Sequence, residues 1–208
     1  MGENRIKLVA ADMDGTLLNR ERKITKYTQN VIKKAMAQGV YFVPATGRAA
    51  NALPPELKEM EGIRYGIFSN GATIYDLKEE KVIYKNHFEM DRVLELMDFL
   101  KQFDLMESIS LNGQSYANKK EMENIDYYEL DSNTKAIVQG SRVLVDDLEM
   151  FVKEQSTTVE KTTLLFKTME ERRRAADALS KIEDIQFSSS LPKNIEISKK
   201  GCNKGDGL

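Results

Sequence analysis

The sequence has 208 residues, which is enough for one large or two small domains. Its 31 basic and 33 acidic residues give a formal net charge of −2, so no basic excess points to nucleic acid. No N-terminal apolar segment resembles a secretory signal, and no run reaches membrane-spanning length. A single cysteine and a single histidine argue against an internal disulfide, Ser-His or Cys-His triads and zinc sites. We therefore expect a cytoplasmic protein without nucleic-acid or membrane partners, in which carboxylates carry any catalysis.

Two carboxylates directly follow an apolar segment near the N-terminus. Leu8–Ala11 is typical of a strand buried on both faces of a parallel sheet, and Asp12 and Asp14 come next. This position lies outside the carboxyl edge of the sheet, where open α/β folds bind ligands. Residues two apart project to the same side, so both carboxylates can face one site. Because their repulsion needs a cation or a shared proton, the pair predicts a divalent-metal site with acid–base chemistry.

A second candidate segment follows the next strand. A helical pattern separates the first strand from a second one, Val40–Val43. The β-α-β order implies parallel strands with a right-handed crossover, so Thr46 lies at the same sheet edge as Asp12. Thr46 offers a hydroxyl, Gly47 a close backbone approach and Arg48 a planar cation suited to phosphate.

The sequence changes character at about His87. Before it, Tyr65–Phe68 is typical of a third strand, and a Ser-Asn-Gly turn and a short hairpin follow. After it, helical patterns alternate with short strands, with a strong hairpin signal at Asn112-Gly113 and a helix-capping box that begins at Thr168. This block has no phosphate-binding signature of its own and would serve as a cap over the catalytic edge.

The predicted fold is α/β, with a parallel Rossmann-like core sheet and an inserted α+β cap domain. We expect residues 1–86 to form the first part of the core, residues 87–194 the cap, and residues 195–208 the return to the core. The candidate residues above then belong to the core, and substrate specificity would come from the cap.

Several segments resemble the motifs of one enzyme family. Asp12–Leu18 (DMDGTLL) resembles the first motif, D-x-D-x-T/V, of the haloacid dehalogenase superfamily of phosphohydrolases. Ala45–Arg48 (ATGR) resembles the second motif of its Cof-type subgroup. In that subgroup an Asn-Gly-Ala lies near the substrate, which implies a substrate-binding role for Asn70. The subgroup also has an Ile-Glu-Ile strand, a short loop and Lys-Gly, which matches Ile195–Ile197 and Lys204 here. The resemblance further implies a cap of the C2B type.

This resemblance implies a Mg²⁺-dependent phosphatase that acts on small phosphorylated metabolites. Asp12 would attack phosphorus to form an aspartyl-phosphate, and Asp14 would serve as general acid and then as general base. Mg²⁺ would be held by the Asp12 carboxylate, the Asp14 backbone carbonyl and waters. The remaining site residues implied are Thr46, Gly47 and Lys204 for the phosphate, and Arg48 and Asn70 for the substrate.

The fourth motif of the family, an acidic Gly-Asp-x-x-x-Asp type that completes the metal site, is absent from the sequence. The chain stops at Leu208, where the family has the first turn of a helix. If the family's strand order holds, Leu8–Ala11 has sheet neighbours from this sequence on one side only. We therefore expect a core that is incomplete at the C-terminus, weak Mg²⁺ binding, and homo-association through the uncovered sheet edge.

The sequence also leaves functions other than a phosphatase open. A truncated, non-catalytic relative would bind metal or phosphate without turnover. A receiver-type signalling domain also places acids at strand ends, but its phospho-acceptor ends a later strand, whereas Asp12 and Asp14 follow the first. A nucleotide-binding kinase is disfavoured because neither G-x-x-x-x-G-K-[ST] nor G-x-G-x-x-G occurs. The substrate and the oligomeric state stay open.

Overall fold

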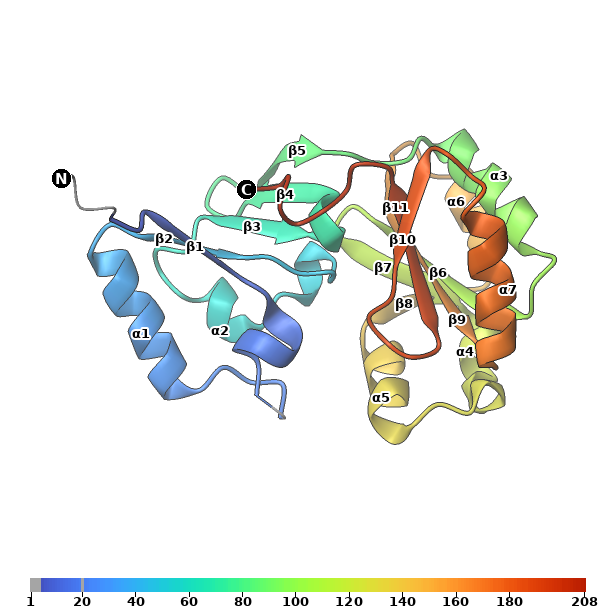
Figure 1. Ribbon diagram of the computed structural model, residues 1–208, viewed down its shortest axis with the longest axis horizontal. Coiled ribbons are helices and arrows are strands. Elements are labelled where there is room, and N and C mark those ends of the chain that lie inside the picture. Colours follow the sequence, from blue (N-terminus) through green and yellow to red (C-terminus); the bar gives the residue numbers. More distant parts are fainter. Residues whose placement is uncertain (1–4, 20) are drawn as a thin grey trace. The chain divides into compact units, whose positions relative to one another are not determined.

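The computed structural model describes residues 5–19 and 21–208 and divides the chain into two compact units (Figure 1). Unit 1 contains the residues up to Lys85 together with Asn203–Leu208, and unit 2 contains Asn86–Cys202. The elements of unit 1 are β1 (Leu8–Ala11), the turn η1 (Met13–Leu17), α1 (Lys26–Ala37), β2 (Tyr41–Pro44), η2 (Ala50–Ala52), α2 (Pro55–Lys58), β3 (Tyr65–Phe68), η3 (Ser69–Gly71), β4 (Thr73–Asp76) and β5 (Lys81–Lys85).

The first three strands of unit 1 run parallel. β1 pairs with β2 in parallel, and α1 forms the crossover between them. Ala45, directly after β2, makes a parallel bridge to Ile67 of β3. β3, β4 and β5 then form an antiparallel sheet. Since the carboxyl ends of β1, β2 and β3 point the same way, the loops that follow them gather at one edge.

Helices α1 and α2 and the strands of unit 1 all contribute to its apolar core. Figure 1 shows the two helices beside β1, β2 and β3. Ile32 of α1 and Leu57 of α2 belong to the same buried cluster as Phe42 and Phe68 of the strands. Met13 joins this cluster and has no exposed surface, although it stands between two polar residues in the sequence. Its burial anchors the turn η1, so that the residues on either side of Met13 are held at the end of β1.

The prediction that Leu8–Ala11 is buried on both faces is wrong. Leu8 is 42% exposed and Val9 38% exposed. Within the described residues, β1 pairs only with β2, so its second edge has no strand beside it. An edge strand cannot bury its side chains as a central strand does.

Unit 2 is a six-stranded sheet with helices. Its elements are α3 (Met90–Leu100), β6 (Leu105–Leu111), β7 (Gln114–Asn118), α4 (Lys119–Glu123), η4 (Ile125–Tyr128), α5 (Ser132–Gly140), β8 (Arg142–Val145), α6 (Leu148–Lys153), β9 (Val159–Phe166), α7 (Met169–Leu179), β10 (Ile185–Ser188) and β11 (Asn194–Lys199). The strand order is β10-β11-β9-β6-β7-β8, and all pairs are antiparallel except β7 with β8. The predicted Asn112-Gly113 hairpin is confirmed between β6 and β7, with φ of 49° and 74°.

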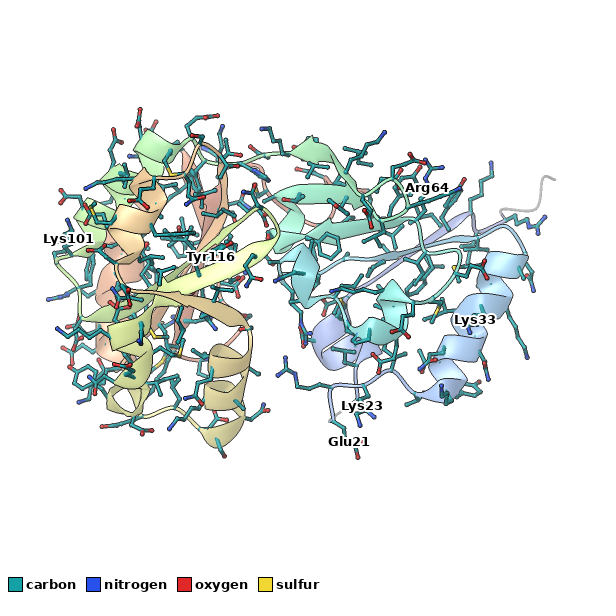
Figure 2. All side chains as sticks on the ribbon, turned by 180° about the vertical axis from the view of Figure 1, so that it is seen from behind. Glu21, Lys23, Lys33, Arg64, Lys101 and Tyr116 are labelled. Carbon is teal, nitrogen blue, oxygen red and sulfur yellow. The ribbon has the colours of Figure 1, made fainter. Side chains whose placement is uncertain are left out.

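Helices pack on both faces of the unit 2 sheet. The larger buried cluster combines α3, α6 and α7 with strand residues, among them Val93, Val152, Leu179, Ile109 and Ile197. The smaller cluster combines α4, η4 and α5 with the opposite face, among them Met122, Ile125, Val138, Met106 and Leu165. Tyr116 of β7 stacks on Phe151 at 4.5 Å between ring centres, and Lys101 after α3 pairs with Glu149 of α6 at 3.0 Å (Figure 2).

The chain re-enters unit 1 later than its sequence predicts. The predicted return to the core is at residue 195, whereas the structure has it at Asn203. The reason is strand pairing, because β11 lies between β9 and β10 and so belongs to the unit 2 sheet. Among the described residues, no helix combines the length and the apolar character needed to cross a bilayer.

Candidate active site

An ion pair joins the two ends of unit 1. Asp12 is the first residue after β1, and Lys204 belongs to the C-terminal segment, 192 positions later. The Nζ of Lys204 donates a hydrogen bond to Oδ1 of Asp12. Both side chains remain partly accessible, with 37% of the Lys204 side chain and 40% of the Asp12 side chain exposed. A ligand can therefore reach both groups from solvent.

The turn η1 carries the second carboxylate, that of Asp14, which pairs with Arg48 and not with Lys204. The turn is closed by hydrogen bonds from Leu17 N to Asp12 O at 3.2 Å and from Leu18 N to Met13 O at 2.9 Å. Gly15 adopts φ of 79°, a left-handed conformation that favours glycine. Asp14 lies in this turn, and 56% of its side chain is exposed.

Arg48 binds Asp14 in a bidentate pair. Arg48 Nε donates to Asp14 Oδ2 at 2.8 Å, and Nη2 donates to Oδ1 at 2.5 Å. Nη1 of the same guanidinium donates to the carbonyl of Ala52 at 3.3 Å. Two parallel charge-assisted bonds fix both the position and the plane of the carboxylate. The role predicted for Arg48 from the sequence is substrate binding, and this contact with Asp14 was not predicted.

Thr46 lies buried at the end of β2. The bond from Ala45 N to Ala11 O, at 2.9 Å, extends the β1–β2 pairing to the residue before Thr46. Thr46 is 1% exposed, and its N–H donates to Ile67 O at 2.8 Å. Its Oγ1 accepts the N–H of Arg48 at 3.1 Å, so the hydroxyl hydrogen is left to be donated elsewhere. Gly47 is held between these two anchored residues.

Hydrogen bonds join the turn η3, which follows β3, to the loop that follows β2. Ser69 N donates to Arg48 O at 2.9 Å, and Asn70 N donates to Thr46 O at 3.1 Å. Ser69, Asn70 and Gly71 all have positive φ, at 50°, 60° and 97°. Asn70 thus reaches the other candidate residues through its backbone. Ser69 is fully buried and was not among the predicted site residues, since only Asn70 was singled out from the Ser-Asn-Gly run.

The C-terminal segment forms a turn of its own around Lys204. Asn203 Nδ2 donates to Asp206 Oδ2 at 2.6 Å, and Asp206 N donates back to Asn203 Oδ1 at 2.9 Å. Leu208 N also donates to Gly205 O at 3.2 Å. Asn203 was not among the residues predicted from the sequence. An Asn whose side chain caps the backbone a few residues later is a recognisable turn signal, so the Asn-x-x-Asp spacing could have found it.

The oxygen donors at this edge have the chemistry that Mg²⁺ prefers. They are the carboxylate of Asp12 and the carboxylate and backbone carbonyl of Asp14, all hard oxygen ligands. Both carboxylates are at present paired with cations, Lys204 and Arg48. Within residues 5–19 and 21–208, no cluster of three or more His, Cys, Asp or Glu residues could hold a metal ion. The donor types therefore fit Mg²⁺, but among the described residues only two carboxylates supply negative charge to bind it.

Comparison with known proteins relates the chain to phosphatases. It is 26% identical over 207 residues to 5-amino-6-(5-phospho-D-ribitylamino)uracil phosphatase YcsE of Bacillus subtilis, a match that covers 98% of this chain and 69% of that protein. It is 38% identical over 121 residues to a protein of Buchnera aphidicola subsp. Schizaphis graminum, a match that covers 57% of this chain and 43% of the relative. The match thus spans less than half the length of that Buchnera relative.

Solved structures confirm the predicted α/β fold. A haloacid dehalogenase-like hydrolase from B. subtilis superposes with a TM-score of 0.81 at 22% identity, covering 98% of this chain and 76% of that one. A sugar phosphatase of subclass IIB of the superfamily gives 0.72 at 21% identity, covering 97% and 73%. The family model for haloacid dehalogenase-like hydrolases matches residues 9–208, and the chain belongs to this family.

Proposed function

We propose that unit 1 carries the active site of a Mg²⁺-dependent phosphatase that acts on small phosphorylated metabolites through an aspartyl-phosphate. The observation that supports this most directly is the contact between Asp12 and Lys204. It brings a carboxylate nucleophile and a phosphate-binding cation together from opposite ends of the sequence. The names of the relatives agree with this chemistry.

In the proposed mechanism Asp12 attacks phosphorus with a carboxylate oxygen. The bond from phosphorus to the leaving oxygen breaks, and that oxygen takes a proton from Asp14. Asp14 then removes a proton from the water that hydrolyses the aspartyl-phosphate. Lys204 and the hydroxyl of Thr46 hold the phosphate oxygens, where charge is spread in the transition state. When bound, Mg²⁺ would be held by the Asp12 carboxylate and the Asp14 backbone carbonyl and would offset negative charge on the phosphate.

The pair of Asp14 with Arg48 orients the carboxylate for proton transfer. Both oxygens of Asp14 accept hydrogen bonds from Arg48, and each keeps a lone pair that can take up a proton. Asp14 can therefore act as general acid and then as general base while Arg48 holds it. Arg48 would also contribute to substrate binding, through the N–H donors that its bonds to Asp14 and Ala52 do not use.

A second candidate function is binding of metal or phosphate without turnover. It is favoured by the small number of acidic groups at the site, since none of the described residues adds a third metal-binding carboxylate to Asp12 and Asp14. Mg²⁺ dehydrates reluctantly and gains little from a partly built octahedral site. This candidate predicts weak binding of Mg²⁺ and of inorganic phosphate with no release of product.

We further propose that the protein acts in the cytoplasm and that β1 can mediate homo-association. The single cysteine supports a reducing compartment. The exposed side chains of Leu8 and Val9, on a strand paired along one edge only within the described residues, support association.

A metal-dependent screen of phosphorylated metabolites tests the proposed function. The purified chain is assayed for phosphate release with Mg²⁺ and with a chelator, beside an Asp12→Asn variant as the matched control. We expect release that requires Mg²⁺ and disappears in the variant, because an amide is nearly isosteric but a poor nucleophile. Equal hydrolysis by both proteins would reject Asp12 as nucleophile. Calorimetric binding of Mg²⁺ and inorganic phosphate without any release would favour the second candidate.

A further inference from the structure

Lys204 is positioned by a close backbone contact between two turns of unit 1. Asn203 lies directly before Lys204, and Gly71 ends the turn η3. A methyl group placed on Gly71 would lie 2.2 Å from the carbonyl oxygen of Asn203, 2.5 Å from its carbonyl carbon and 3.1 Å from its nitrogen. These are backbone atoms, so they cannot move aside as a flexible side chain would. Only glycine allows this approach.

The same glycine also has a conformational reason to be there. Its φ of 97° lies in the region that glycine adopts freely and other residues rarely do. Ser69 and Asn70 precede it with positive φ as well, and their N–H groups are bonded to Arg48 O and Thr46 O. The turn is thus fixed to the second-strand loop on one side and contacts Asn203 on the other.

The segment on the other side of the contact is closed by side-chain bonds. Asn203 and Asp206 exchange two hydrogen bonds, at 2.6 and 2.9 Å, which tighten the turn that carries Lys204. Gly207 lies against Ile67 of β3, where a methyl group added to the glycine would be 3.1 Å from the nearest side-chain carbon. The segment is therefore held at both ends while Lys204 Nζ reaches Oδ1 of Asp12.

We infer that η3 and the Asn203–Asp206 turn together form a seat for Lys204, with Gly71 and Asn203 as its positioning residues. Each of them acts on Asp12 through the lysine. The role of Lys204 in phosphate binding rests on the proposed function, whereas the seat itself is a statement about where Lys204 lies. The two can therefore be tested separately.

The test measures how fast Lys204 is labelled. Reductive dimethylation followed by mass spectrometry gives a rate for each lysine, with exposed Lys200 as the internal reference. In the wild type, the ion pair with Asp12 protects Lys204. Asp12→Asn removes the partner and defines the unprotected rate, about two- to fivefold faster for a partly exposed ion pair.

We expect Gly71→Ala to raise the labelling of Lys204 to the rate found in Asp12→Asn. The matched control is Gly39→Ala, since Gly39 has φ of 83° but nothing within 4 Å of an added methyl group. It carries the same backbone strain without the clash and should leave the rate at the wild-type value. Folding of each variant is checked by circular dichroism. A folded Gly71→Ala protein with wild-type labelling would overturn the inference.

Asn203→Ala provides a second route should Gly71→Ala fail to fold. It removes the two bonds to Asp206 from an exposed turn and adds no atoms, so the fold should persist. We expect faster labelling of Lys204 here too, and an unchanged rate would contradict the seat. Faster labelling of Lys204 in the variants, together with no phosphate release by the wild type, would reject the proposed function and keep the seat. Unchanged labelling in the variants, together with normal turnover by the wild type, would reject the seat and keep the proposed function.

Discussion

Asp14 and Arg48 lie on the loops that follow β1 and β2, and the guanidinium of Arg48 donates to both oxygens of the Asp14 carboxylate. The backbone of Arg48 is itself fixed, because its N–H donates to Thr46 Oγ1 and its carbonyl accepts from Ser69 N. The orientation of the carboxylate on the first loop therefore depends on the second and third loops. This relationship gives the first prediction.

Replacing Arg48 by lysine should lower kcat about ten- to a hundredfold, because an ammonium cannot make two parallel bonds and leaves Asp14 misplaced. Steady-state kinetics on the best substrate of the metabolite screen measure the loss. Arg64→Lys is the matched control. Arg64 (Figure 2) also binds a carboxylate, Asp76, through Nε and Nη2 at 3.0 Å each. It lies at the start of β3, whereas the loops with the candidate residues follow the ends of the strands. Wild-type kcat in Arg48→Lys would contradict the prediction.

Asp14→Asn should reduce turnover by about two to four orders of magnitude, the range for loss of a general acid–base group. Both half-reactions should slow, since the proposed mechanism uses this carboxyl first as acid and then as base. Rapid-quench measurement of phosphoenzyme formation and breakdown separates the two steps. A variant that differs from the wild type only in its apparent affinity for Mg²⁺ would show that Asp14 is a metal ligand and not a proton carrier.

The sequence predicted those parts of this site that depend on local pattern. Hydrophobic periodicity predicts the order of strand, helix and strand. The two acids are then found directly after the predicted strand Leu8–Ala11. The contact of Lys204 with Asp12 spans 192 positions, and only the resemblance to a family suggested Lys204. The resemblance to the family also suggested the uncovered edge of β1, whereas the exposure of the Leu8 and Val9 side chains was not predicted, because the apolar pattern alone indicated burial. The pairing of Arg48 with Asp14 depends on side-chain conformations that no spacing rule specifies.

Glu107 of β6 should make the stability of unit 2 depend on pH. Burial is the largest cause that raises the pKa of Glu107 to about 8, followed by the charges of Glu121 on α4 and Glu149 on α6. Glu107 Oε1 is buried without a hydrogen-bond partner among the described residues. Glu149 is itself paired with Lys101 and Lys153.

The sign of this effect follows from proton binding. Between the ordinary pKa of a glutamate and about 8, the folded state holds a proton that the unfolded state has lost. The free energy of unfolding should therefore fall as pH rises through this window and stay low above it. Glu107→Gln should remove the dependence and raise stability at pH 9 by a few kcal/mol at most. Denaturant titrations at pH 5 and pH 9 measure it, with exposed Glu123→Gln as the control. Parallel pH profiles for Glu107→Gln and the wild type would contradict the prediction.

The last prediction concerns the exposed edge of β1. Its backbone pairs with β2 on one side, and within the described residues no strand pairs with the other, so its N–H and C=O groups can accept a strand from a second chain. Leu8 and Val9 add exposed apolar surface to the same edge. We expect the protein to dimerise or form larger species as its concentration rises, measured by size-exclusion chromatography with light scattering.

A lysine on this edge should oppose the association. Val9→Lys places a charge where a second strand would dock, and it should shift the protein toward monomer at a concentration where the wild type associates. Val82→Lys is the matched control, because Val82 is 47% exposed on β5, the outer strand of the antiparallel sheet in unit 1. If β1 is the interface, the control should associate as the wild type does. A wild-type protein that stays monomeric at every concentration, or an equal effect of both lysines, would remove β1 from consideration as a docking edge.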